Sequence, residues 1–306
     1  MRISKILYPF AKRFIAGHNF ESAQPVIAKL IRDGYMVSID YLGELSKTKK
    51  DCERAYNQYM EIIDFYQSSN IDISIKPSQL GLKFDFSLCC DYVQSLAWHA
   101  FAYGSTIRLD MEDASLIKPT LKLCFKLRKD VDNVGVAIQT NMYRTKKDLP
   151  DLMAAKISIR LVKGAYKGNK KIAYQKKKQI QKLFLRQALT IISDRCRSYY
   201  NLKEQDAPVH AIGTHDADII RSIIRNLKKI NAGKKDFDFE LLYGIRRDIS
   251  SSLQKEGYCV RLYVPFGEDW IPYTLRRLRE FKNLKFVIIN IITEIFSGKT
   301  NKFKVA

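Results

Sequence analysis

Eight short apolar segments, each followed by a longer stretch with helical spacing, constrain the fold of this chain more than any other feature. Each segment is rich in β-branched residues and ends in polar residues or glycine, a pattern typical of buried parallel strands that lead into helices. Their starts lie roughly 20 to 50 residues apart, which leaves room for one helix and its loops. The expected strands are Met36–Asp40, Ile71–Ile75, Thr106–Leu109, Val134–Ile138, Ile157–Val162, Val209–Ile212, Phe237–Leu242 and Cys259–Val264.

This alternation predicts an α/β fold, a (β/α)8 TIM-type barrel with N-terminal helices before the first strand. Alternating strands and helices form a parallel sheet with covered faces, and eight such units close a barrel. A doubly wound open sheet is the alternative, but the GxGxxG turn that such sheets use for dinucleotides is missing. We expect one domain over the 306 residues, made of an N-terminal helical arm (1–35), the barrel (36–295) and a basic tail (296–306).

The formal net charge of +21 raises nucleic acid or an anionic membrane as a partner. The lysines are spread along the chain and accompany no nucleic-acid motif, so we expect a solvated surface and no nucleic acid, with attraction to anionic lipid as the alternative. The six cysteines show neither a CxxC pair nor metal-ligand spacing, which indicates a reducing compartment, no disulfide framework and no metal site.

The apolar stretches are all shorter than the roughly 20 residues that cross a membrane. The basic, amphipathic segment Met1–Gly17 lacks the apolar core and cleavage site of a secretory signal. We therefore expect a cytoplasmic protein that is soluble or that contacts the inner membrane peripherally.

Nearly every expected strand ends in side chains that can take part in chemistry. Active sites of (β/α)8 barrels are built at these C-terminal strand ends. Any one such residue is more often a helix cap or a turn residue, so the recurrence carries the argument. The groups are Asp40 with Glu44, Lys76, Asp110 with Glu112, Gln139 with Asn141, Lys163, Thr214 with His215 and Asp216, and Tyr243.

The segment Trp270–Glu280 is expected to open the last helix, with Pro272 tolerated in its first turn. At about 100° per residue, one face of this helix carries an aromatic ring, two guanidinium groups and a carboxylate. Two adjacent guanidinium groups can bind a small carboxylate in fork geometry, and an acidic residue on the same face can fix one of them. The alternative is a solvated basic face. The four residues are Tyr273, Arg276, Arg277 and Glu280.

The same segment resembles the YVPxG…YxxRRxxE signature of proline dehydrogenases, which begins here with Tyr263-Val-Pro-Phe-Gly267. A second string, Arg160-Leu-Val-Lys163-Gly164-Ala165-Tyr166, is similar to the RLVKGAY string of that family. The resemblance runs in the right order from about residue 13 to 290. Further matching positions are Arg13–Gly17, Leu42–Glu44, Ile75–Lys76 with Gln79–Gly81, Asp110–Glu112, Gln139, Thr214–His215 and Leu242–Gly244.

This resemblance implies an FAD-containing, distorted (β/α)8 barrel that oxidises L-proline to 1-pyrroline-5-carboxylate, the first step of proline breakdown to glutamate. It implies electron transfer to a membrane quinone, with a separate 1-pyrroline-5-carboxylate dehydrogenase acting next. The active-site groups implied are Asp110 and Arg160, and the residues implied to bind the proline carboxylate are Lys76, Arg276 and Arg277. The further substrate-binding residues are Tyr273, Glu280, Glu44, Tyr166, Leu242 and Tyr263, and the FAD-binding residues are Met111, Gln139, Lys163, Gly164, Ala165, Thr214 and His215.

Physical chemistry agrees with several of these implied roles. Arg160 near a flavin can stabilise the negative charge of the reduced ring, and Gly164 allows the backbone to approach a cofactor phosphate beside the charge of Lys163. Glu44, Asp110 and Glu280 can offset the positive charge of an empty carboxylate site.

One departure from the family pattern is Asp216, which stands where the family commonly has asparagine. The competing hypotheses are a barrel flavoprotein with another substrate, similar to methylenetetrahydrofolate reductase, and a basic protein without enzymatic activity that binds nucleic acid or membranes.

Overall fold

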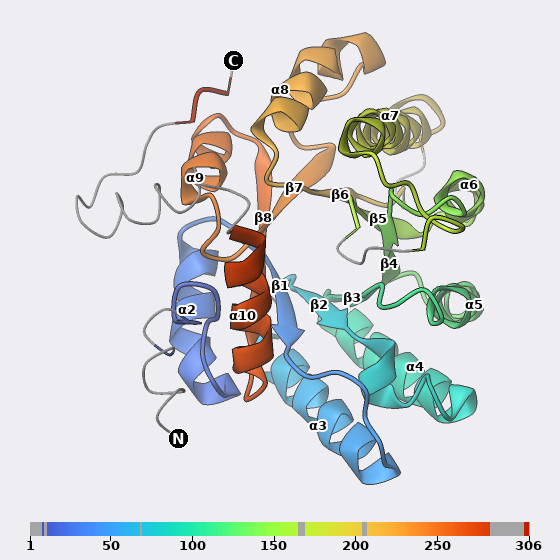
Figure 1. Ribbon diagram of the computed structural model, residues 1–306, viewed down its shortest axis with the longest axis vertical. Helices are drawn as coiled ribbons and strands as arrows, with labels where there is room; N and C mark the ends of the chain where they lie inside the picture. Colours follow the sequence, from blue (N-terminus) through green and yellow to red (C-terminus); the bar gives the residue numbers. More distant parts are fainter. Residues whose placement is uncertain are drawn as a thin grey trace. The chain divides into compact units, whose positions relative to one another are not determined.

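The computed structural model describes residues 8, 11–67, 69–164, 169–203, 207–281 and 303–305, with side chains described as far as Arg277 in the last helix. Its strands follow one another in the order β1 to β8 in a closed barrel, with a helix after each strand (Figure 1). The predicted (β/α)8 fold is therefore confirmed. The strands are β1 Met36–Tyr41, β2 Asp72–Ile75, β3 Thr106–Leu109, β4 Val134–Gln139, β5 Ser158–Val162, β6 His210–Gly213, β7 Phe237–Leu242 and β8 Cys259–Phe266.

The first two helices begin at side-chain caps that the sequence supplies. Asn19 and Ser22 form a capping box before α2, and Thr48 and Asp51 form one before α3, so each helix starts with its first backbone N–H groups satisfied. The helices are α2 Phe20–Arg32, α3 Lys49–Phe65, α4 Phe86–Ala102, α5 Ile117–Leu127, α6 Thr145–Ala154, α7 Lys177–Cys196, α8 Ala217–Asn226, α9 Arg247–Lys255 and α10 Trp270–Phe281. The short turns are η1 Pro77–Leu80, η2 Arg197–Asn201 and η3 Leu227–Ile230.

The described strands agree closely with the predicted ones. β3 and β7 have the predicted bounds, whereas β8 continues two residues beyond the predicted end at Val264. It does so because Pro265 and Phe266 stay in register with Asp40 and Tyr41 of β1.

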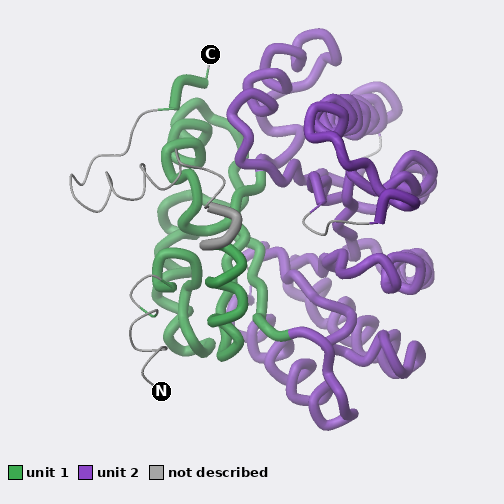
Figure 2. Tube along the Cα trace, in the orientation of Figure 1, with its two compact units in different colours: residues 1–43, 240–306 green, residues 44–239 purple. Residues whose placement is uncertain are grey.

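The chain divides into two compact units, shown in different colours in Figure 2. Unit 1 comprises residues 1–43 and 240–306, and unit 2 comprises residues 44–239. In unit 1, β1 and β8 pair in parallel from Met36 opposite Arg261 onwards. The backbone N–H of Ala16 donates to the Pro265 carbonyl at 2.8 Å, which ties the N-terminal segment to the end of β8.

In unit 2, strands β2 to β6 pair in parallel with their sequence neighbours. Alternate residues of β2, β3 and β5 are polar, while the residues between them are apolar and buried. Successive side chains of a strand point to opposite faces, so the polar ones share one face of the sheet. They are Asp72, Ser74, Thr106, Arg108, Ser158 and Arg160.

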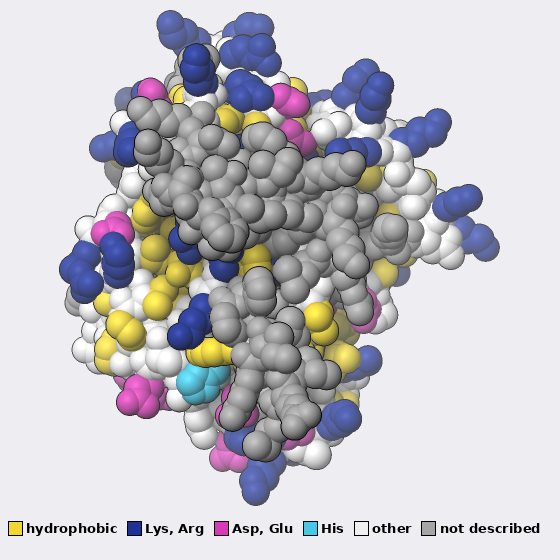
Figure 3. All heavy atoms as spheres, turned by 60° about the vertical axis from the view of Figure 1, so that its left-hand side comes forward, with side chains coloured by type: hydrophobic (Ala, Val, Ile, Leu, Met, Phe, Trp, Pro, Cys, Tyr) yellow, Lys and Arg dark blue, Asp and Glu magenta, His cyan; other side chains and the backbone are white. Residues whose placement is uncertain are grey.

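Basic side chains on the face shown in Figure 3 stand in separate small groups, with acidic and hydrophobic side chains between them. None of the helices in the described part of the chain is long and apolar enough to span a membrane. The six cysteines are free thiols, and all except Cys259 are buried.

Candidate active site

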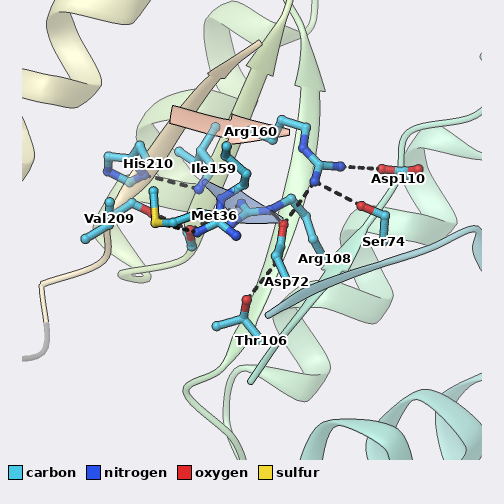
Figure 4. A network of polar contacts seen from close by, with 12 residues as sticks. Met36, Asp72, Ser74, Thr106, Arg108, Asp110, Ile159, Arg160, Val209 and His210 are labelled. Carbon is cyan, nitrogen blue, oxygen red and sulfur yellow. Dashed lines mark hydrogen bonds and ion pairs between the residues drawn. The ribbon is translucent and has the colours of Figure 1, made fainter. Parts of the chain in front are cut away.

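Arg160 lies at the centre of a buried polar network in unit 2 (Figure 4). Its Nη1 donates to Asp110 Oδ1 at 2.7 Å, while Nη2 donates to Asp72 Oδ2 at 3.0 Å and to Ser74 Oγ at 2.9 Å. Strands β2 and β5 are not neighbours in the barrel, so these side chains meet on the inner side of the curved sheet. The network therefore fixes the Arg160 guanidinium at both of its terminal nitrogens.

The C-terminal ends of β2 and β3 bring two more of the predicted residues together. Lys76 directly follows β2, and its ammonium nitrogen lies 3.8 Å from Asp110 Oδ2. Lys76 and Arg160 are both more than nine-tenths buried, so water screens their charges little. Asp110 thus lies between two cations, Lys76 and Arg160.

Glu112 extends this polar region beyond β3. Its carboxylate accepts the Ser78 backbone N–H at 2.9 Å and also the Ser78 hydroxyl, and its carbonyl accepts Gln139 Nε2 at 3.4 Å. Burial raises the pKa of Glu112, and the hydrogen bonds from Ser78 and the charge of Lys76 oppose that rise. Met111 is half-buried immediately after Asp110.

A second polar cluster joins the end of β5 to the start of α8. Asp216 accepts Lys163 Nζ at 2.6 Å and Gln181 Nε2 at 2.9 Å, and its other oxygen caps α8 by accepting the N–H groups of Asp218 and Ile219. Burial is the largest influence and raises the pKa of Asp216, but the bonds from Lys163 and Gln181 and the lysine charge together lower it to about 2.

The backbone next to this cluster contains a glycine that no other residue could replace without strain. Gly164 has φ +105°, and a Cβ there would lie 2.1 Å from Asn141 Oδ1. Lys163, Gly164 and His215 are half-buried, whereas Gln139 and Thr214 are buried. A partly open surface with a lysine, a glycine and amide or hydroxyl groups fits an anionic cofactor. Ala165 and Tyr166, predicted in the same string, lie outside the described residues.

In unit 1, α10 places the predicted aromatic residue and both arginines on one face. The guanidinium carbons of Arg276 and Arg277 lie 5.7 Å and 5.2 Å from the centroid of the Tyr273 ring. Tyr273 and Arg277 are buried, and Arg276 is half-buried. The Glu280 side chain lies outside the described ones.

Tyr273 also belongs to an apolar cluster within unit 1. Leu242 packs against this cluster, and the carbonyl of the half-buried Tyr263 accepts the Tyr243 N–H at 2.9 Å. The cluster gives α10 a rigid base, because its aromatic residues are held by packing. Its buried members are Ala11, Phe14, Ile15, Leu42, Ile245, Trp270 and Tyr273.

The structure thus brings the predicted residues into three groups. In unit 2, Lys76, Asp110 and Arg160 form one group, and Lys163 with its neighbours forms another. In unit 1, the arginine pair and Tyr273 form the third. Glu44 is exposed, and its charge contributes to raising the pKa of Glu112.

Sequence reasoning missed the inner members of the Arg160 network. On β2, Asp72 and Ser74 precede the predicted Lys76, and on β3, Arg108 precedes the predicted Asp110, in each case on the same face of the strand. His210 is the first residue of β6. The signal was a polar residue at every second position of strands that are otherwise apolar. No group of three or more potential metal ligands among His, Cys, Asp and Glu occurs within the described residues.

Comparisons with known proteins point in one direction. The family model described as proline dehydrogenase matches residues 14–287. Proline dehydrogenase 1 of Bacillus subtilis subsp. natto is 31% identical over 285 residues, which cover 92% of this chain and 90% of that protein. The proline dehydrogenase of Deinococcus radiodurans is 32% identical over 290 residues, with 92% and 90% covered.

Solved structures show a similar fold. The crystal structure of proline utilization A from Bdellovibrio bacteriovorus, inactivated by N-propargylglycine, superposes with a TM-score of 0.81 at 21% identity, covering 98% of this chain and 35% of that chain. Proline utilization A from Bradyrhizobium japonicum, in the D778Y mutant, gives a TM-score of 0.72 at 22% identity, covering 90% of this chain and 31% of that one.

Proposed function

Because the chain belongs to the proline dehydrogenase family, an oxidoreductase family of proline catabolism, we propose that it oxidises L-proline to 1-pyrroline-5-carboxylate with bound FAD. The proposed electron acceptor is a membrane quinone. The product then passes to a separate 1-pyrroline-5-carboxylate dehydrogenase. The enzyme would act in the cytoplasm and reach the inner membrane peripherally, and no nucleic acid is involved.

The arrangement of Tyr273, Arg276 and Arg277 on α10 carries the proposal for the substrate. Proline combines a carboxylate with a small apolar ring, and two guanidinium groups beside one aromatic ring match these two parts. In this proposal the arginines bind the carboxylate and Tyr273 covers the ring. Lys76 as a further carboxylate ligand rests on the family resemblance, as do Leu242, Tyr263 and Tyr166 as pocket walls and Glu44 and Glu280 as charge-balancing groups.

The proposed FAD site uses the second polar cluster of unit 2. A bound flavin would accept the hydride from the carbon beside the proline nitrogen. Lys163 supplies a cation for a cofactor phosphate, and Gly164 leaves the backbone beside it without a side chain. The remaining proposed FAD contacts are Met111, Gln139, Ala165, Thr214 and His215.

In the proposed reaction, Arg160 and Asp110 orient the reacting groups. Arg160 would supply positive charge to a flavin bound beside it, and its bond to Asp110 keeps the guanidinium in place at 2.7 Å. Both side chains are largely removed from water, which strengthens electrostatic effects on a bound ligand.

An absorbance spectrum of the purified protein, before and after anaerobic addition of L-proline, tests the proposed reaction. We expect a flavin spectrum that proline bleaches. A colourless protein that also fails to take up added FAD would contradict the cofactor proposal. A flavin that proline leaves oxidised, but that another amine or a folate reduces, would point to the related barrel flavoproteins.

The substitution Arg276→Met tests the carboxylate site. Loss of one of two charge-assisted contacts should raise the KM for proline by about 10- to 100-fold while FAD stays bound. Arg225→Met, on the exposed face of α8, is the matched control and should leave KM unchanged. Equal KM values for proline in the two variants would contradict the proposal that Arg276 binds the proline carboxylate.

The proposed membrane contact is tested separately with vesicles. The net charge of +21 predicts retention on anionic vesicles that weakens as salt is raised, since each Lys or Arg near anionic lipid contributes about 1 kcal/mol. Sedimentation with vesicles containing phosphatidylserine, against neutral vesicles, gives the measurement. If both types of vesicle leave the protein in solution at physiological salt, the peripheral contact is wrong.

A further inference from the structure

Asp72 is a fully buried carboxylate within the Arg160 network. It lies at the start of β2, its side chain is fully buried, and it accepts hydrogen bonds from two guanidinium groups. Arg108 Nε donates to Asp72 Oδ2 at 2.8 Å, and Arg160 Nη2 donates to the same oxygen at 3.0 Å. Thr106 Oγ1 donates to the other oxygen at 2.8 Å. One carboxylate thus joins strands β2, β3 and β5 (Figure 4).

The neighbouring strand β4 leaves room for the two arginines. At the register positions opposite Arg108 and Arg160 it carries Gly135 and Ala137. A Cβ at Gly135 would lie 3.1 Å from Arg108 Nη1 and 2.6 Å from the Ser158 carbonyl oxygen. The inner layers of most (β/α)8 barrels are filled by branched apolar side chains, so small residues beside two buried arginines indicate a built-in polar layer.

Arg108 is fixed from its other side as well. Its Nη1 donates to Ser158 Oγ at 3.2 Å, and the Ser158 hydroxyl donates to the Val209 carbonyl at 2.6 Å. Arg108 thus bonds to Asp72 and Ser158, whereas Arg160 spans from Asp72 to Asp110. The two guanidinium groups thus share one oxygen of Asp72, and its negative charge partly neutralises both.

We propose that Asp72 is a positioning residue that holds Arg160 toward Asp110 and, together with Arg108, sets how much positive charge Arg160 presents to the reaction site. This inference rests on the proposed function, because the charge at Arg160 would act by changing how readily a bound flavin is reduced. Removing a buried carboxylate leaves the site more positive, which favours the negatively charged reduced flavin. Removing the Arg108 charge has the opposite effect.

The test measures the midpoint potential of the bound flavin in three variants. We expect Asp72→Asn to raise the potential and Arg108→Gln to lower it, each by an order of tenfold in the reduction equilibrium, or about 30 mV for a two-electron couple. The double variant loses one charge of each sign and should return toward the original potential. Shifts in midpoint potential that have opposite signs and cancel in the double variant indicate an effect of charge, because damage to the fold would not be reversed by a second substitution.

Asp236→Asn is the matched control, because Asp236 is also a buried carboxylate in unit 2 but bonds to Tyr200 and to the Gly233 N–H. It should leave the potential unchanged. Potentials that shift in the same direction for Asp72→Asn and Arg108→Gln, or that do not shift, overturn the inference. If Asp72→Asn does not fold, Arg108→Gln and the double variant carry the same comparison.

A readout without flavin separates this inference from the proposed function. In the flavin-free protein, hydrogen bonds at both Nη atoms should hinder rotation of the Arg160 guanidinium, so that its two Nη groups give separate NMR signals. The variant Arg160→Lys, which lacks these signals, assigns them. Asp72→Asn should merge these signals. Signals that stay separate in Asp72→Asn overturn the positioning role, whereas merged signals in a protein that never binds flavin support it and reject the proposed function alone.

Discussion

A single carboxylate changes the chemistry available to Lys163. Asp216 accepts the lysine ammonium at 2.6 Å, so the cation proposed to meet a cofactor phosphate already has a negatively charged partner. An amide at this position would leave the full lysine charge for the ligand. Because Asp216 also caps α8, the acidic residue serves the helix and the lysine at once.

We predict that Asp216→Asn raises the affinity for FAD by about tenfold, which corresponds to about 1.4 kcal/mol. Asparagine is as good an N-cap as aspartate, so α8 should keep its start while Lys163 is released. Titration of the flavin-free protein with FAD, followed by flavin fluorescence, gives the dissociation constant. Asp218→Asn removes an exposed carboxylate on the same helix and should leave the affinity as it was; an equal gain in both variants would mean that general charge is responsible.

The sequence predicted Arg160, Asp110 and Lys76 as one site but not their buried partner. Lys76 and Asp110 were predicted from their positions at strand ends and from the family resemblance, and Arg160 from the resemblance of the RLVKGAY string alone. The bond between Arg160 and Asp72 joins residues 88 apart in the sequence on strands that are not neighbours. Strand order and register must be known before such a pair can be recognised, so local spacing could not reveal it.

At the level of elements, the small residues of β4 are explained by the arginine side chains of its neighbours β3 and β5. Gly135 and Ala137 weaken a strand by propensity, but they lie beside arginines that fill the space a larger side chain would take. Periodicity predicted this strand from its valines and isoleucine and was right about its existence. It did not explain the glycine, since that explanation depends on the side chains of β3 and β5.

We expect Gly135→Val to lower the free energy of unfolding by about 2 kcal/mol or more. A Cβ at this position would meet the Ser158 carbonyl oxygen at 2.6 Å, and backbone atoms in a sheet cannot move aside cheaply. Urea unfolding followed by circular dichroism gives the difference. Gly257→Asn is the control, because a Cβ at Gly257 meets nothing within 4 Å and asparagine tolerates its positive φ. Similar losses in the two variants would show that crowding at β4 is not the cause.

The eight strands were predictable because each is a short segment rich in β-branched residues that ends in polar residues or glycine and is followed by a stretch with helical spacing. The end of β8 was placed two residues short, because the pairing that extends it depends on β1: Pro265 lies opposite Asp40, and its carbonyl accepts the Ala16 N–H. The packing of α10 could not be predicted from the sequence of that helix alone, because Phe14 and Ile15 of the N-terminal segment complete the cluster around Tyr273.

For the molecule as a whole, one buried imidazole links stability to pH. His210 is 1% exposed, and its Nδ1 accepts the Ile159 N–H at 3.1 Å. Burial lowers the pKa of His210 to about 3, and the charges of Arg108 and Arg195 act in the same direction. The folded protein therefore keeps this ring neutral where the unfolded chain would take up a proton.

The sign of the effect follows from this depressed pKa. The stability contributed by the neutral ring is fully present above pH 6.5, the usual value, and is lost as pH falls toward 3. In this window His210 should make the free energy of unfolding fall by about 1.4 kcal/mol per pH unit. His210→Gln should give a shallower dependence in urea unfolding at constant ionic strength. A variant with the same slope as the parent protein would show that other groups carry the acid sensitivity.

The buried cysteine thiols can be used to measure local unfolding of the helices that contain them. Burial raises the pKa of Cys124 and of Cys196 to about 12, so neither thiol reacts readily with alkylating reagents at neutral pH while the fold is closed. Five of the six cysteines belong to helices and are buried, whereas Cys259 in β8 is partly exposed. The rate at which each cysteine becomes labelled, read by mass spectrometry, would rank helices α3, α4, α5 and α7 by how often they open, without any added probe.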